Sequence, residues 1–235
     1  MATCGLDLAR RGKLRRNTIV GTVLTNMGFS RFCEENGLKF AATKVGDRYV
    51  LEEMELEGYV LGGEQSGHVI FRDFATTGDG QLTAIQLLCL MKRSGRPLSE
   101  LAQVMRRMPQ VMVNVTVSKE GKLQFYNNDA IKTACAGAKD RLGSRGRVLV
   151  RVSGTEPLVR VMVEGEDEAE ISTIAGELAQ LVEKELAFAG AAPFFCSVER
   201  RYPFSFNHSI AVLANTAAPR YSTLSSKVTR GLCCG

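Results

Sequence analysis

Short apolar runs rich in Ile, Val and Thr alternate with longer helix-forming segments through residues 1–109, and this alternation most constrains the fold. The runs have the length of strands, and β-branched side chains pack well on a pleated sheet. Two of the helical segments follow a capping residue, Thr25 or Asn26 for one and Thr77 or Asp79 for the other. The alternation predicts a parallel or mixed sheet covered by helices.

The elements predicted for this first part end at Pro109, where we place a domain boundary. Strands are expected at 18–24, 38–43 and 59–61. Helices are expected from the cap near 26 to 36, and at 47–57, 81–93 and 99–107. Residues 1–109 are therefore predicted to form a mixed α/β domain.

The pattern changes after the boundary, where alternating strands and two long helices share a shorter stretch of chain. Strands are expected at 111–117, 147–152 and 158–163, and helices at 129–141 and 167–186. The last helix has an acidic first turn, which suits the positive end of the helix dipole. Two helices on one face of an antiparallel-rich sheet predict a small α+β domain over 110–190.

Residues 191–235 show no sustained hydrophobic period, and we predict a disordered extension there. This extension holds five basic residues and one acidic residue, whereas residues 1–190 hold 25 basic and 24 acidic ones. The extension therefore carries +4 of the net charge of +5. The nearly neutral remainder has no electrostatic footprint for nucleic acid, so we expect no nucleic-acid partner.

Several other classes are excluded by composition. No apolar run approaches the ~20 residues that span a bilayer, and the N-terminus has no signal-peptide pattern, so we expect a cytoplasmic protein without a membrane partner. The seven cysteines form no Cys-x-x-Cys, and neither histidine has a second histidine at ligand spacing. We therefore expect no zinc site.

The first loop that carries chemistry is Gly62-Gly63-Glu64-Gln65-Ser66-Gly67-His68, directly after a predicted strand. Its three glycines let the backbone approach a ligand closely. A carboxylate, an amide, a hydroxyl and an imidazole project from the same turn, and such groups suit sugar hydroxyls, which both donate and accept. The alternative is a glycine-rich connection with incidental polar residues.

The second loop joins two predicted strands and reads Arg151-Val152-Ser153-Gly154-Thr155-Glu156-Pro157-Leu158-Val159-Arg160. Successive backbone N–H groups around Gly154 can form an anion-binding nest. Two hydroxyls and two arginines add further donors, and a guanidinium binds phosphate through forked hydrogen bonds. A plain turn explains the loop but not this concentration of donors. Neither Gly-Lys-Ser/Thr nor Gly-x-Gly-x-x-Gly is present, so nucleotide binding has little support.

In these motifs the chain resembles the α-D-phosphohexomutase family. The first loop is similar to the sugar-recognition loop of the family's third domain, and the second to the phosphate-binding loop of its fourth domain. Lys44-Val45-Gly46-Asp47-Arg48-Tyr49-Val50 is similar to another active-site loop of the third domain. The resemblance covers about residues 4–188 and includes the order and separation of all three motifs.

The resemblance implies an isomerase that interconverts glucosamine 6-phosphate and glucosamine 1-phosphate for UDP-N-acetylglucosamine synthesis. Gln65 and the Asp47-Arg48-Tyr49 stretch favour glucosamine, while mannose or glucose phosphate remains the alternative. By matching position, Glu64 and Ser66 would bind sugar hydroxyls, Asp47 and Arg48 would also contact the substrate, and His68 would transfer a proton. The residues that would bind the non-transferring phosphate are Arg151, Ser153, Gly154, Thr155 and Arg160.

Two parts of the family's machinery do not occur in this sequence. The family's phosphoserine lies in Ser-His-Asn-Pro and its Mg²⁺ loop contains Asp-x-Asp, and the chain has neither pattern. We therefore expect no metal ligands and no turnover from the isolated chain, with a missing N-terminal half as its partner. A non-catalytic sugar-phosphate-binding fragment is the alternative.

Overall fold

The computed structural model describes residues 1–186 and 197–199, all of them within one compact unit that spans Met1–Glu199. The extension predicted over 191–235 lies outside the described residues apart from 197–199. Among the described residues, no helix combines the length and the apolar character needed to cross a membrane.

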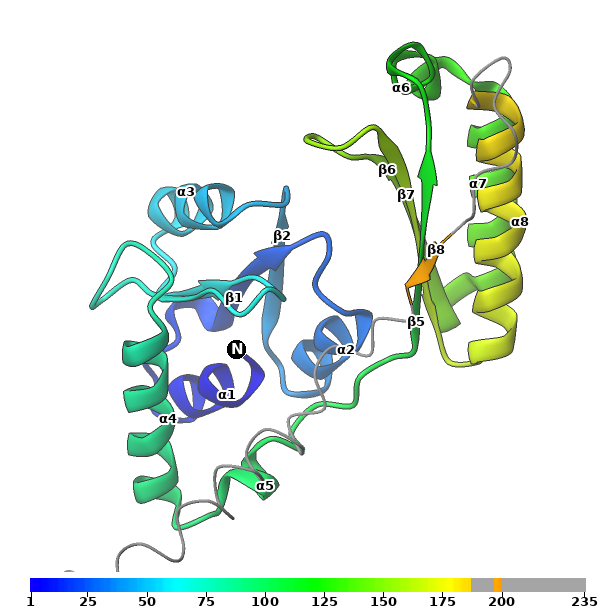
Figure 1. The fold of residues 1–235 in the computed structure, drawn as a ribbon. Helices are drawn as coiled ribbons and strands as arrows, with labels where there is room; N and C mark the ends of the chain where they lie inside the picture. Colours follow the sequence, from blue (N-terminus) through cyan, green and yellow to red (C-terminus); the bar gives the residue numbers. More distant parts are fainter. Residues whose placement is uncertain (187–196, 200–235) are drawn as a thin grey trace, which may run out of the picture. The chain divides into compact units, whose positions relative to one another are not determined.

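The first part of the chain forms a mixed four-stranded sheet in the order β2-β1-β3-β4 (Figure 1). Strand β1 runs parallel to β2 and β3, and β4 is antiparallel to β3. The mixed α/β prediction for this part is therefore confirmed. Its elements are α1 (Ala2–Arg10), β1 (Thr18–Thr22), α2 (Met27–Glu35), β2 (Lys39–Thr43), α3 (Asp47–Glu57), β3 (Leu61–Gly63), β4 (Val69–Phe71), α4 (Gly80–Ser94) and α5 (Leu98–Leu101).

Strand β1 is buried along its whole length, so both of its faces pack against helices, whereas the edge strand β2 is only partly buried. Ile19 joins a core with residues of α1 and α2 on one face. Its neighbour Val20 packs against Val50 and Met54 of α3 on the other face. Helices α2 and α4 are capped by the preceding residues Asn26 and Asp79, whose side chains accept hydrogen bonds from the first-turn N–H groups of Gly28 and Leu82.

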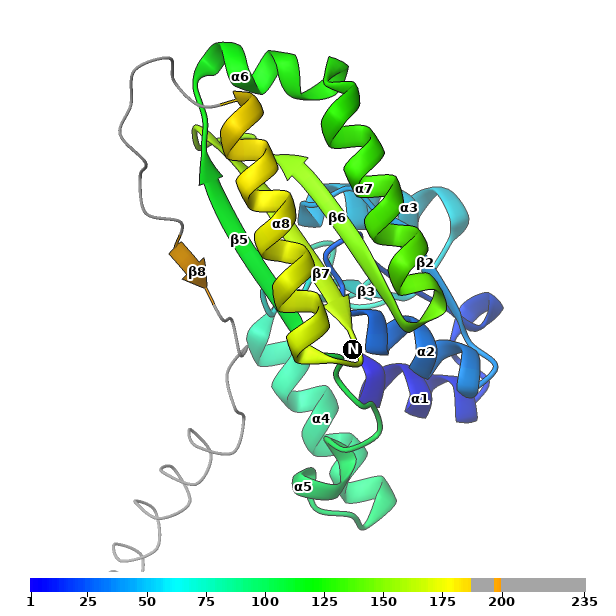
Figure 2. The ribbon, with the colours of Figure 1, turned by 90° about the vertical axis from the view of Figure 1, so that its right-hand side faces the viewer.

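The second part forms an antiparallel sheet in the order β6-β7-β5-β8. Helices α7 and α8 lie side by side along one face of it (Figure 2). This arrangement confirms the α+β prediction. The elements are β5 (Gln110–Thr116), α6 (Lys119–Gln124), α7 (Asp129–Leu142), β6 (Gly146–Val152), β7 (Leu158–Gly165), α8 (Glu168–Leu186) and β8 (Ser197–Glu199).

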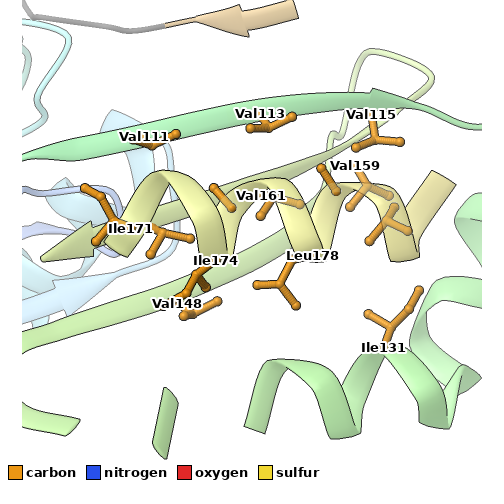
Figure 3. Close-up of a cluster of buried hydrophobic side chains, with 14 of the residues drawn as sticks. Val111, Val113, Val115, Ile131, Val148, Val159, Val161, Ile171, Ile174 and Leu178 are labelled. Atoms are coloured by element: carbon orange, nitrogen blue, oxygen red, sulfur yellow. The ribbon is translucent and has the colours of Figure 1, made fainter. Parts of the chain in front are cut away.

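Alternate residues of β5, β6 and β7 build the core beneath these helices (Figure 3). Val113 and Val161 are almost completely buried against Ile171 and Ile174 of α8. Each such side chain stabilises the fold by roughly 1.5–3 kcal/mol on burial. Because side chains alternate along a strand, the residues between these valines point to the opposite face.

That opposite face carries three successive rows, each made by residues that face one another across β5, β7 and β6. The first row is Gln110, Glu164 and Arg147; the second is Met112, Met162 and Leu149; the third is Asn114, Arg160 and Arg151. On this surface, one apolar row thus lies between two polar rows.

The first two rows contact the first part of the chain. Glu164 is fully buried and accepts hydrogen bonds from Asn26 Nδ2 at 3.1 Å, Met27 N at 3.0 Å and Arg147 Nε at 2.5 Å. Burial raises the pKa of Glu164, and these donors, Arg147 foremost, oppose that rise. In the second row, Met162 packs with Leu24 and Val45.

The structure differs from the predicted elements in two places. The third strand is Leu61–Gly63 instead of 59–61, because Gly62 lies so close to α3 that an added Cβ would be 2.5 Å from Met54 Sδ. In place of the predicted helix 99–107, the structure has a shorter helix, Leu98–Leu101. Downstream of it, Met108 exchanges two hydrogen bonds of 3.0 and 3.1 Å with the Asn26 side chain. Helices α1 and α6 and strands β4 and β8 had not been predicted. Strand β8, Ser197–Glu199, lies within the extension predicted to be disordered, and the prediction is wrong for these three residues because they pair with β5.

Replacing Glu164 by alanine should lower the free energy of unfolding by about 3–5 kcal/mol, because Arg147 loses its buried partner. The matched control is Glu166→Ala. That carboxylate lies two residues away, is half exposed and pairs with Arg31 at 2.7 Å, so its loss should cost about 0–1 kcal/mol. Urea unfolding followed by circular dichroism measures both, and equal losses would contradict a special role for the buried carboxylate.

Candidate functional site

The first loop is a tight turn that joins β3 to β4. Glu64 N donates to His68 O at 2.9 Å, which closes the turn. Gly67 has φ 105°, a conformation that favours glycine. A Cβ on Gly63 would lie 2.4 Å from His68 O. Two of the three glycines are thus required by the turn itself.

The polar side chains of this loop gather around His68. Ser66 Oγ lies 3.3 Å from His68 Nδ1, and Glu64 Oε2 lies 4.0 Å from the same nitrogen. His68 and Ser66 are exposed, whereas the Glu64 side chain is only 13% exposed. A carboxylate, a hydroxyl and an imidazole therefore share one short turn, with the exposed hydroxyl and imidazole open to solvent.

Glu64 also ties this loop to the loop before α3. Its Oε1 accepts the Gly46 N–H at 2.9 Å, and Gly46 has φ 132°. This contact brings two of the predicted motifs together through one carboxylate. The sequence alone gave no signal for it, because the two residues lie 18 positions apart.

Asp47 and Arg48 begin α3 just beyond Gly46. Asp47 Oδ1 accepts the Arg48 N–H at 2.8 Å, and Arg48 Nε donates to Glu52 Oε1 at 2.7 Å. The hydrogen bond to Glu52 raises the pKa of Arg48. The Arg48 side chain is 83% exposed, so a ligand can reach it.

The second loop is stabilised by Ser153. Its N–H donates to Leu158 O at 2.9 Å and its Oγ accepts the Glu156 N–H at 3.2 Å, while the residue is only 3% exposed. Gly154 and Thr155 are exposed, and their N–H groups donate to no acceptor within the described part of the chain. These two N–H groups are therefore available to an anion.

Arg151 and Arg160 face each other in the third row. Their Nε atoms are buried and lack a hydrogen-bond partner in the described structure. Burial lowers the pKa of Arg151, and the positive charge of Arg160 lowers it further. The terminal Nη2 of Arg160 pairs with the carboxylate of Glu156 in the same loop.

Lys122 is a cation at this loop that the sequence pattern did not single out. Its Nζ donates to the backbone carbonyl of Glu156 at 3.0 Å. Helix α6, which carries it, is short and follows Ser118, whose side chain accepts the Gly121 N–H. Ser118 three residues before Gly121 is a capping signal that could have located this helix.

A series of contacts connects all three motifs on one side of the second sheet. Met162 lies one row from Arg160 and packs with Val45, and Val45 is followed by Gly46, which donates to Glu64. The polar groups of the first loop and the arginines of the second are thus linked by a short series of contacts. Among residues 1–186 and 197–199, no group of three His, Cys, Asp or Glu side chains could hold a metal ion.

Two sequence profiles of a single family match consecutive stretches of the chain. The profile described as phosphoglucomutase/phosphomannomutase, alpha/beta/alpha domain III, matches residues 1–108. The profile described as phosphoglucomutase/phosphomannomutase, C-terminal domain, matches residues 112–181. Together they cover the first sheet and most of the second, without residues 110–111 of β5 and without β8.

Curated relatives agree with the profiles. The phosphoglucosamine mutase of Caldanaerobacter subterraneus subsp. tengcongensis is 53% identical over 186 residues, which cover 79% of this chain and 42% of the relative. The phosphoglucosamine mutase of Ruminiclostridium cellulolyticum is 53% identical over 187 residues, covering 80% and 42%. The chain spans less than half the length of the curated relatives it matches.

Solved structures share the fold at lower identity. The N-acetylphosphoglucosamine mutase of Aspergillus fumigatus matches with a TM-score of 0.66 and 18% identity, over 80% of this chain and 43% of that one. A phosphoglucomutase/phosphomannomutase family protein from Burkholderia thailandensis matches with a TM-score of 0.57 and 23% identity, over 79% and 43%. The chain belongs to the phosphoglucomutase/phosphomannomutase family, the α-D-phosphohexomutases, and holds the region of the family's third and C-terminal domains.

Proposed function

We propose that this chain is the sugar-phosphate-binding half of a phosphoglucosamine mutase, the enzyme that interconverts glucosamine 6-phosphate and glucosamine 1-phosphate. The observation that carries the proposal is the paired arginines of the third row, whose buried Nε atoms lack partners beside two open backbone N–H groups. Such a set of donors suits a phosphate dianion.

In this proposal the second loop binds the phosphate that is not transferred. Arg151 and Arg160 supply forked hydrogen bonds, and Gly154 and Thr155 supply backbone N–H groups. The Ser153 hydroxyl shapes the loop and keeps its own proton free to donate. Phosphate must displace the Glu156 carboxylate from Arg160, so binding exchanges one charged partner for a doubly charged one.

The first loop would bind the sugar. Glu64 and Ser66 would bind hydroxyls, and Asp47 and Arg48 would contact the substrate from the α3 end. His68 would move a proton at the reacting hydroxyl, since its ring is exposed and lies beside a carboxylate at 4.0 Å. Identity of 53% to enzymes named phosphoglucosamine mutase supports glucosamine over mannose or glucose phosphate. The Aspergillus enzyme was solved in complex with GlcNAc-6P and magnesium.

Magnesium would be bound by the family's N-terminal half, whose metal-binding loop is not found in this sequence. Among the described residues, no group of three His, Cys, Asp or Glu side chains could hold a metal ion, and the sequence has no Asp-x-Asp. The sequence also has no Ser-His-Asn-Pro for a phosphoserine. We therefore assign positioning of the substrate to this chain, and phosphoryl transfer to the family's N-terminal half as its partner.

Replacing Arg160 by alanine should weaken the binding of inorganic phosphate by about ten- to a hundredfold, because a hydrogen bond to a charged group contributes roughly 1.5–3 kcal/mol. Isothermal titration calorimetry measures this. Arg96→Ala is the control, since Arg96 pairs with Glu100 near α5 and should leave phosphate binding unchanged. Equal affinity in Arg160→Ala and the unmodified chain would remove the phosphate assignment.

Replacing Glu64 by alanine should weaken the binding of glucosamine 6-phosphate about tenfold and leave the binding of inorganic phosphate unchanged, because in our proposal the carboxylate contacts hydroxyls and not the anion. Competition titrations with the two ligands test this. Glu57→Ala, which removes a surface pair with Arg16, serves as the control. If both ligands weakened equally, Glu64 would act only through its contact with Gly46.

The purified 235-residue chain should not convert glucosamine 6-phosphate, even with Mg²⁺ and a sugar bisphosphate, because it supplies no phosphoryl donor. A coupled assay for glucosamine 1-phosphate measures this. Adding a separately expressed N-terminal half of a relative should restore some turnover. If the chain alone were active, and this activity survived repurification and disappeared with Arg151→Ala, phosphoryl transfer would not require the N-terminal half and the proposal would be contradicted.

A further inference from the structure

Asn114 completes the row that holds the two arginines. It faces Arg160 across β5 and β7, and Arg160 faces Arg151 across β7 and β6. Its neighbours Val113 and Val115 are buried in the core under the helices, so the Asn114 side chain points to the opposite face. All three polar side chains therefore lie side by side on one face of the sheet.

The three residues share an unusual feature. In the described part of the chain, the buried side-chain polar atoms without a hydrogen-bond partner are Asn114 Oδ1, Arg151 Nε and Arg160 Nε. A buried polar atom without a partner is destabilising, and such atoms are few in folded proteins. Here one acceptor and two donors occupy adjacent positions of a single row, which indicates a set of groups arranged for a ligand-bound state.

The neighbouring contacts explain why these atoms are unpaired without a ligand. The Glu156 carboxylate holds Arg160 Nη2, which directs the guanidinium toward the loop. A phosphate that replaced Glu156 would take both Nη groups as a fork and leave Nε–H facing away from the anion. The acceptor without a partner in this row is Asn114 Oδ1.

We infer that Asn114 is a positioning residue of the phosphate site, an inference that rests on the proposed function. Its Oδ1 accepts the Nε–H of Arg160 when phosphate is bound, and this fixes the plane of the guanidinium for two-point contact. A neutral amide orients the arginine without neutralising it. An aspartate at this position would instead form an ion pair and compete with phosphate, as Glu156 does.

The test is calorimetry with inorganic phosphate on the full chain. Asn114→Ala should bind about tenfold more weakly than the unmodified chain. Because Asn114 acts through Arg160, adding Asn114→Ala to Arg160→Ala should cause no further loss. Gln110→Ala, on the same face of the same strand two rows away, should leave affinity unchanged.

Asn114→Asp distinguishes a positioning role from a merely structural one. The aspartate should pair with the arginines and so raise the melting temperature of the ligand-free protein, yet it should weaken phosphate binding more than Asn114→Ala does. This variant also keeps the side-chain shape if the alanine variant does not fold. Failure of the unmodified chain to bind phosphate would overturn the proposed function. Phosphate binding that Arg160→Ala weakens, but that neither Asn114 variant weakens, would overturn this inference alone.

Discussion

Two arginines are held opposite each other on β6 and β7, with Cβ atoms about 5 Å apart, and the sheet gives them no freedom to separate. Their strand neighbours Val150, Val159 and Val161 belong to the core under α7 and α8. A slip of one residue would expose those valines and bury the guanidinium groups. The register that builds the core therefore also maintains a like-charged pair, which in our proposal a bound anion stabilises.

The same register sets the other two rows. Moving along β7 from Arg160, Met162 packs with Val45 and Glu164 accepts hydrogen bonds from Asn26 and Met27. A proposed phosphate-binding arginine, an apolar contact and a buried carboxylate thus follow one another at two-residue intervals. This explains how the proposed phosphate and sugar loops, far apart in the sequence, are connected through a few side chains.

Local patterns predicted the elements that have strong local signals. Helix Asp47–Glu57 has the predicted bounds, since Gly46 precedes it and Gly58 follows it in the left-handed conformation. The strand at Leu61–Gly63 was misplaced because two consecutive glycines are typical of a loop. The structure shows instead that Met54 of α3 packs against Gly62 and leaves no room for a side chain there. The motifs identified the candidate loops, whereas the contact of Glu64 with Gly46 and the row position of Asn114 depend on pairing across strands and loops. Neither feature can be predicted from the local sequence.

The melting temperature as a function of phosphate concentration tests the central claim most directly, with sodium chloride of equal ionic strength as reference. A ligand that binds only the folded state raises stability in a saturable way. The account predicts a saturable rise for the unmodified chain and its loss in Arg151→Ala/Arg160→Ala, leaving only the weak, unsaturated effect that phosphate has on protein surfaces. The same phosphate-dependent rise in both proteins would contradict it.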